Sequence, residues 1–173
     1  NIGLEETDKI IEISKNIDID LKSDGTVLMD GEDATKEIRS KEVTSIVSPI
    51  SSIVEVRKNM VDIQRKIAKG NNVVMEGRDI TTVVFPNAEL KVFVTATAEV
   101  RAQRRYDELK AKGEEQPYAD VLANVQERDY RDTHRAESPL RQADDARLLD
   151  NSNMTREEQF EILKSWFNET ISA

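Results

Sequence analysis

Apolar residues recur along this chain with two different spacings. Residues 5–15 have the helical spacing, whereas residues 17–21 alternate between apolar and polar and the chain returns through residues 26–29. Ser23-Asp24-Gly25 between the two runs is typical of a tight turn, so the pattern predicts a short helix followed by a β-hairpin. No strand–helix–strand pattern occurs here, which indicates a small α+β unit.

A long helix is expected from Ser48-Pro49 to Lys69-Gly70, because serine is a common cap, proline suits the first helical position and glycine ends helices. Its apolar stripe is formed by Ile50, Ile53, Val54, Met60, Val61, Ile67 and Ala68. Arg57 lies on this stripe, where a guanidinium must either extend to solvent or find a partner. The pattern alone favours extension to solvent.

From residue 71 onward, strands and helices alternate. Short apolar runs predict strands at 73–75, 90–94 and 147–150, and helices at 99–112 and 119–135 are expected to pack antiparallel. A capping box at 155–158 predicts a last helix, with four core-facing side chains: Phe160, Leu163, Trp166 and Phe167. The alternation predicts an α/β fold with a doubly wound parallel sheet, whose ligands bind at the carboxyl ends of the strands.

Composition narrows the function classes. The 173 residues carry a net charge of −9, contain no cysteine and include one histidine. A nucleic-acid binder that relies on bulk positive charge, a disulfide framework and a Cys- or His-based metal site are therefore not expected. No apolar run approaches the roughly 20 residues of a membrane span. We expect a cytoplasmic protein without a metal site or a membrane partner.

The first candidate for chemistry is Glu76-Gly77-Arg78-Asp79, which follows the predicted strand 73–75. Arg78 can fork onto a phosphate, and Asp79 can accept hydrogen bonds from an amino group. An ordinary polar loop explains the same residues equally well.

A second candidate lies in the predicted helix 119–135, where Arg128, Asp132 and Arg135 share one face at i, i+4 and i+7. Two guanidinium groups and a carboxylate suit a sugar phosphate, because the cations bind the phosphate and the carboxylate accepts from the ribose hydroxyls. A solvated face with i,i+4 ion pairs is the alternative, and the pattern alone favours it.

A third candidate is the group Arg101, Arg104 and Arg105 on one side of the preceding helix. Together with the polar loop 113–117, they form an arginine-lined helical hairpin that is typical of a lid over phosphates. A surface charge patch is the alternative.

These segments together resemble bacterial cytidylate kinase. Gly77-Arg78-Asp79-Ile80-Thr81-Thr82-Val83-Val84-Phe85-Pro86 is similar to the family signature Gly-Arg-Asp-x-Gly-Thr-x-Val-Phe-Pro. The similarity continues through 96–105 and 127–135, and it includes 30–33 with 38–39, so it covers essentially the whole chain. The resemblance implies transfer of a phosphoryl group from ATP, with Mg²⁺, to CMP or dCMP by a monomer that binds no nucleic acid.

The resemblance also implies a P-loop nucleoside-monophosphate-kinase fold. Residues 1–70 correspond to the α+β monophosphate-binding insert and connecting helix, residues 71–173 to the C-terminal part of the kinase core, and about 101–135 to the lid. Implied substrate ligands are Ser48, Arg57 and Asp79 for cytosine, Arg78 and Arg135 for the phosphate, and Arg128 and Asp132 for the ribose. Implied catalytic residues, near the transferring phosphoryl group, are Arg104, Arg105 and Arg131.

Two departures from the family pattern matter. Thr81 replaces a glycine, and a β-branched residue is costly there if its φ is positive. None of the six glycines belongs to a Gly-x-x-x-x-Gly-Lys-[Ser/Thr] loop. By resemblance, we expect that loop, a central strand and most Mg²⁺ ligands to precede residue 1, and we expect the chain as given to be inactive. A non-catalytic CMP-binding module and a P-loop kinase for another small acceptor remain alternatives.

Overall fold

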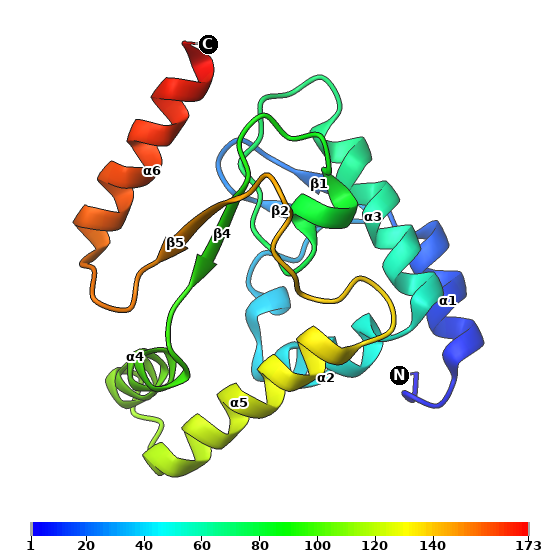
Figure 1. The fold of residues 1–173 in the computed structure, drawn as a ribbon. Coiled ribbons are helices and arrows are strands. Elements are labelled where there is room, and N and C mark those ends of the chain that lie inside the picture. Colours follow the sequence, from blue (N-terminus) through cyan, green and yellow to red (C-terminus); the bar gives the residue numbers. More distant parts are fainter. Residues whose placement is uncertain (1, 173) are drawn as a thin grey trace. The chain divides into compact units, whose positions relative to one another are not determined.

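The computed structural model describes residues 2–172, without the side chains of Lys41 and Ser48. The chain forms two compact units, divided between Met75 and Glu76, and Figure 1 shows their elements.

The first unit begins with a helix and a small antiparallel sheet. Its elements, in the order β1-β2-β3 within the sheet, are α1 (Thr7–Asn16), β1 (Ile19–Leu21), β2 (Val27–Met29) and β3 (Glu32–Asp33). The predicted hairpin is therefore confirmed, with Gly25 at a φ of 88° in its turn. The third strand was not predicted. It forms because Asp30 and Gly31, both with positive φ, reverse the chain a second time.

The predicted helix from Ser48 to Lys69 is wrong, because the structure contains two helices there. A 3-10 turn, η1 (Glu37–Arg39), precedes α2 (Lys41–Ser51), and α3 (Val54–Ala68) follows. The cap of α2 is Ser40, whose Oγ accepts from the Val43 N–H at 3.2 Å. Pro49 lies near the end of α2, and the chain becomes extended at Ile53. A proline marks a helix boundary, but the sequence does not say on which side the helix lies.

The core of the first unit forms where α3 packs on α1 and β1. Val56, Val61 and Ala68 of α3 are buried. One polar contact joins the two helices, since the amide of Asn59 donates to the buried Ser14 hydroxyl at 2.8 Å. The satisfied polar pair fixes the two helices against each other.

The second unit contains a parallel sheet, which makes the chain a mixed α/β protein. Strand β4 (Val92–Thr95) pairs with β5 (Arg147–Asp150) in parallel, as predicted. The helices of this unit are α4 (Ala98–Ala111), α5 (Tyr118–His134) and α6 (Arg156–Ile171).

The predicted strand at 73–75 is wrong. These residues have no strand assignment, and Val74 is fully exposed. An apolar run forms a strand only when a neighbour completes its hydrogen bonds, and no described strand pairs with this one. After it, a π-helical turn η2 (Ile80–Val84) buries Ile80 and Val84. Thr81 lies in this turn without a positive φ, so the expected backbone cost of replacing glycine does not arise.

Helices α4 and α5 are joined by a continuous apolar seam. Thr97 caps α4, and Gly113, at a φ of 76°, follows its last turn. The seam buries Ala102, Leu109 and Val121, with Tyr106, Tyr118, Leu122 and Val125 packed against them. The helices cross steeply instead of running antiparallel, since Figure 1 shows α4 nearly end-on while α5 runs across the picture.

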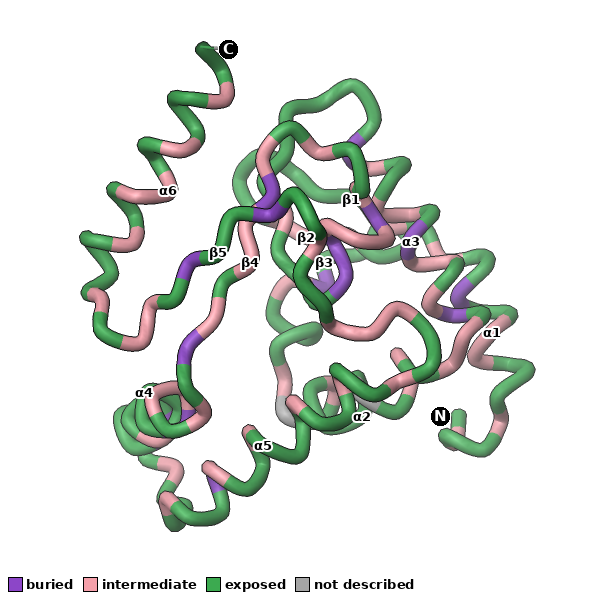
Figure 2. The backbone as a smooth tube through the Cα atoms, viewed as in Figure 1, coloured by how far each residue is buried: buried purple, intermediate pink, exposed green. Residues whose placement is uncertain are grey.

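Helix α6 has the predicted capping box but not the predicted core face. The Thr155 hydroxyl accepts from the Glu158 N–H at 3.1 Å, and the Glu158 carboxylate accepts from the Thr155 N–H at 2.8 Å. Phe160 and Phe167 are nevertheless exposed and no described residue of α6 is buried, as Figure 2 shows. The two-stranded sheet beside α6 offers too little apolar surface to cover it. Among the described residues, no helix is both long and apolar enough to cross a membrane.

Candidate functional site

The candidate site is centred on the carboxylate of Asp132, on α5. Its Oδ2 accepts from Arg78 Nε at 2.7 Å and lies 3.9 Å from Arg128 Nε, and its Oδ1 lies 3.7 Å from Arg135 Nη1. The shared face of Arg128, Asp132 and Arg135 is as predicted. Arg78 joins them from 54 residues away in the sequence. We call these four residues the Asp132 cluster.

The Asp132 cluster concentrates positive charge in an acidic chain. Three guanidinium groups surround one carboxylate, so the local formal charge is positive although the chain carries −9. Arg78 and Arg128 are about half exposed or more, whereas Asp132 is largely buried. The half-buried carboxylate therefore holds guanidinium groups that solvent can reach. This arrangement suits an anion with several oxygens, such as a phosphate.

The turn after α5 positions the last arginine of the cluster. The Arg135 Nε donates to the Ser138 carbonyl at 2.7 Å, and the Leu140 N–H donates to the Asp132 carbonyl, also at 2.7 Å. Ser138 adopts a positive φ of 49° in this turn. The chain folds back on the end of α5 and limits the directions that Arg135 can take.

Asp79 is held in the segment that carries Arg78. It is buried, and its backbone carbonyl accepts from the Val83 N–H at 2.8 Å at the start of η2. The π-helical turn thus fixes the backbone beside Arg78. The structure brings Arg78 and Asp79 to the same unit as the Asp132 cluster.

The other predicted arginines contact different partners. Arg104 donates to Asn151, through Nη1 to the side chain at 2.9 Å and through Nη2 to the backbone carbonyl at 2.7 Å. Arg105 donates to Glu108 at 2.9 Å, and Arg131 lies 3.8 Å from Glu127. These partners, Asn151, Glu108 and Glu127, lie outside the Asp132 cluster.

The lid prediction grouped Arg101 with Arg104 and Arg105, but Arg101 contacts the neighbouring helix α5. Its guanidinium binds both carboxylate oxygens of Asp129, at 2.7 and 2.6 Å. This hydrogen bonding raises the pKa of Arg101. The sequence interpretation missed Asp129. The signal was present, because Asp129 continues the helical stripe of Leu122 and Val125.

Two predicted cytosine ligands belong to the first unit. Arg57 is half-buried on α3, whereas the Ser48 side chain lies outside the described residues. The prediction placed both on one helix, whereas the break at Ile53 puts Ser48 on α2 and Arg57 on α3.

Among the described residues, no group of three or more acidic or histidine side chains gathers into a metal site. His134, the only histidine, stacks on Tyr130 with ring centroids 4.1 Å apart.

Comparisons with known proteins identify the family. The family model described as Cytidylate kinase matches residues 1–169. The cytidylate kinase of Bacteroides thetaiotaomicron is 48% identical over 171 residues, which cover 96% of this chain and 75% of the relative. That of Bacteroides fragilis is 52% identical over 163 residues, with 94% and 71% covered. That of Caldicellulosiruptor saccharolyticus is 45% identical over 174 residues, with 99% and 77% covered. This chain therefore belongs to the cytidylate kinase family.

Proposed function

We propose that the protein transfers the γ-phosphoryl group of ATP to CMP or dCMP, which gives CDP or dCDP. The observation that carries this proposal is the Asp132 cluster, three guanidinium groups around one carboxylate, in a member of this family. The relatives named cytidylate kinase support the acceptor.

The Asp132 cluster contains groups that suit both the phosphate and the ribose of a nucleotide. Arg78 and Arg135 would bind the phosphate of CMP, because guanidinium groups match its oxygens in pairs. Arg128 and Asp132 would contact the ribose, where a carboxylate accepts from hydroxyl groups. The substrate would then replace part of the contact between Arg78 and Asp132.

Cytosine would be read by Ser48, Arg57 and Asp79. A carboxylate can accept from the exocyclic amino group of cytosine, and a guanidinium can donate to its carbonyl oxygen and ring nitrogen. Residues 1–70 would form the monophosphate-binding insert, and residues of about 101–135 the lid. The parallel sheet and its helices, residues 71–173, would belong to the kinase core.

Phosphoryl transfer requires positioning and charge neutralisation instead of a protein nucleophile. Arg104, Arg105 and Arg131 would stabilise the transferring group. To do so, Arg104 must leave Asn151 and Arg105 must leave Glu108. ATP is the co-substrate, and Mg²⁺ would neutralise its phosphates. The Gly-x-x-x-x-Gly-Lys loop is not in this sequence, so the residues here describe the acceptor side only.

The test is a coupled assay of the full-length protein with ATP and CMP, dCMP, UMP or AMP. We expect turnover with CMP and dCMP well above that with UMP or AMP. CMP binding without turnover would contradict the proposal and support a non-catalytic CMP-binding module. A preference for UMP, AMP or another acceptor would support a kinase of different specificity.

One variant tests the assignment of the base. Arg57→Met should raise the KM for CMP without changing the KM for ATP, since the guanidinium is proposed to contact cytosine only. Lys58→Met, at an exposed position on the same helix, is the matched control. Equal effects of the two variants on CMP would contradict the role of Arg57.

A further inference from the structure

The apolar seam between α4 and α5 becomes charged at one end. Tyr118, Val121, Leu122 and Val125 supply the α5 side of the seam. The next position on this stripe is Asp129, four residues after Val125. Arg101, beside the fully buried Ala102 of α4, faces it. An ion pair thus occupies the position where another apolar contact would continue the seam.

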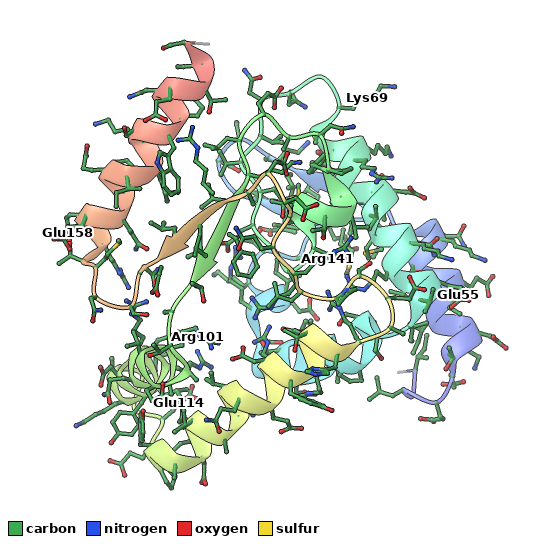
Figure 3. The ribbon with its side chains drawn as sticks, in the orientation of Figure 1. Glu55, Lys69, Arg101, Glu114, Arg141 and Glu158 are labelled. Atoms are coloured by element: carbon green, nitrogen blue, oxygen red, sulfur yellow. The ribbon has the colours of Figure 1, made fainter. Side chains whose placement is uncertain are left out.

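The ion pair of Arg101 with Asp129 is bidentate, and we call it the fork. Nη1 and Nη2 of Arg101 donate to Oδ1 and Oδ2 of Asp129 at 2.7 and 2.6 Å, while Nε donates to the Ala96 carbonyl at 3.0 Å. Ala96 is buried and follows the last residue of β4. Arg101, labelled at the start of α4 in Figure 3, therefore joins the end of the strand and both helices.

The fork fixes the relative orientation of its two side chains more than it stabilises the folded protein. The side chains of Arg101 and Asp129 are 38% and 36% exposed, so water screens much of their attraction. Two parallel hydrogen bonds nevertheless fix the relative orientation of two groups, which one point charge cannot do. A lysine at position 101 would keep the charge and lose the fork.

The orientation of Asp129 determines the orientation of its neighbours on α5. Asp129 follows Arg128 directly and lies about 60° from Asp132 around the helix at 3.6 residues per turn. A rotation of α5 about its own axis would therefore move the ligand-binding face by the same angle. We propose that Arg101 and Asp129 are positioning residues, which fix the rotation of α5 and so align the Asp132 cluster with the phosphorylated acceptor. This inference rests on the proposed function.

The experiment compares Arg101→Lys and Asp129→Asn with the wild type in the full-length protein. Since guanidinium groups that are out of line bind the acceptor less tightly, we expect the KM for CMP to rise about tenfold, a loss of about 1.4 kcal/mol in binding free energy. The kcat and the KM for ATP should change little. Amide hydrogen exchange should become faster in the second half of α5. Arg147→Lys is the matched control, because Arg147 forms a similarly exposed pair with Glu169 at 2.6 Å. It should leave the KM for CMP unchanged.

A second variant separates positioning from folding. Arg101→Met combined with Asp129→Leu extends the apolar seam, so we expect it to keep its melting temperature while the KM for CMP stays high. A wild-type KM in this double variant would overturn the inference. So would a lower melting temperature of Arg101→Lys with an unchanged KM. If the wild type does not phosphorylate CMP, the proposed function fails. Hydrogen exchange then tests only whether the contact of Arg101 with Asp129 fixes α5. Unchanged exchange in α5 of Arg101→Lys would overturn that claim.

Discussion

The α4–α5 pair and the β4–β5–α6 region belong to the same unit but differ in how much apolar surface they bury. Ala102, Leu109 and Val121 are almost inaccessible in the helix pair. Leu148 of β5 and Phe160 of α6 are 55% and 60% exposed. Two neighbouring helices complete a core by themselves, whereas a parallel sheet needs layers on both faces. The stability of this unit should therefore depend mainly on the helix pair.

The largest expected effect is the loss of stability when a buried residue of the α4–α5 seam is truncated. Leu109→Ala removes a buried side chain, and such changes cost about 2–5 kcal/mol in the free energy of unfolding. Leu148→Ala, the matched control in the exposed strand, should cost about 0.5 kcal/mol or less. Urea denaturation of both variants measures the difference. Similar costs would mean that the sheet is buried in the folded protein.

The face of α5 that carries Asp132 should affect function more than stability. Asp132→Ala should lower kcat/KM for CMP by about tenfold to a hundredfold, since a hydrogen bond to a charged group contributes about 1.5–3 kcal/mol. Its melting temperature should stay near that of the wild type. Asp120→Ala, in the first turn of the same helix, is the control and should keep kcat/KM. Unfolding of the Asp132 variant without a specific loss of CMP turnover would contradict this expectation.

Removing the helix caps compares the two regions directly. The hydroxyls of Thr97 and Thr155 each accept from the third backbone N–H of α4 and α6, and loss of such a cap costs about 1 kcal/mol. Thr155 also belongs to a capping box with Glu158. We expect Thr155→Ala to accelerate hydrogen exchange in α6 alone, because no described residue of α6 is buried. Thr97→Ala should lower global stability without local fraying of α4. The same exchange pattern in both variants would contradict the comparison.

The smallest effect should be a pH dependence of α6. Hydrogen bonding to Arg147 lowers the pKa of Glu169. A lowered folded-state pKa stabilises the protein above the unfolded-state pKa, and this contribution is lost as the pH falls through the folded-state value. Thermal melts between neutral pH and about pH 3 should show a smaller acid loss for Glu169→Gln than for the wild type. An identical loss would exclude Glu169 as a contributor.

Local signals in the sequence predicted the elements that depend on local contacts. Strand β5 has the predicted bounds, 147–150, and the cap of α6 is the predicted Thr155. The prediction of a strand at 73–75 was wrong because strand formation depends on a partner that is distant in the sequence. The predicted helix start was wrong because Pro49 was taken as the first helical position, whereas Ser40 caps α2.

The candidate site was predictable to a similar extent. Helical spacing placed Arg128, Asp132 and Arg135 on one face, which the structure confirms. The contact between Arg78 and Asp132 spans 54 residues and depends on how the chain folds back. The lid prediction grouped Arg101 with Arg104 and Arg105, because charge alone does not reveal that a carboxylate on the next helix holds Arg101.

The formal charges in the Asp132 cluster do not balance. Three arginines against one carboxylate leave an excess of two positive charges, three minus one. A phosphate monoester carries two negative charges only above its second ionisation, near pH 6. A phosphate monoester bound as proposed would therefore neutralise the cluster as the dianion, whereas the monoanion present in more acidic solution would leave one charge unmatched. A single proton on the substrate would then weaken binding although no residue of the protein changes its ionisation.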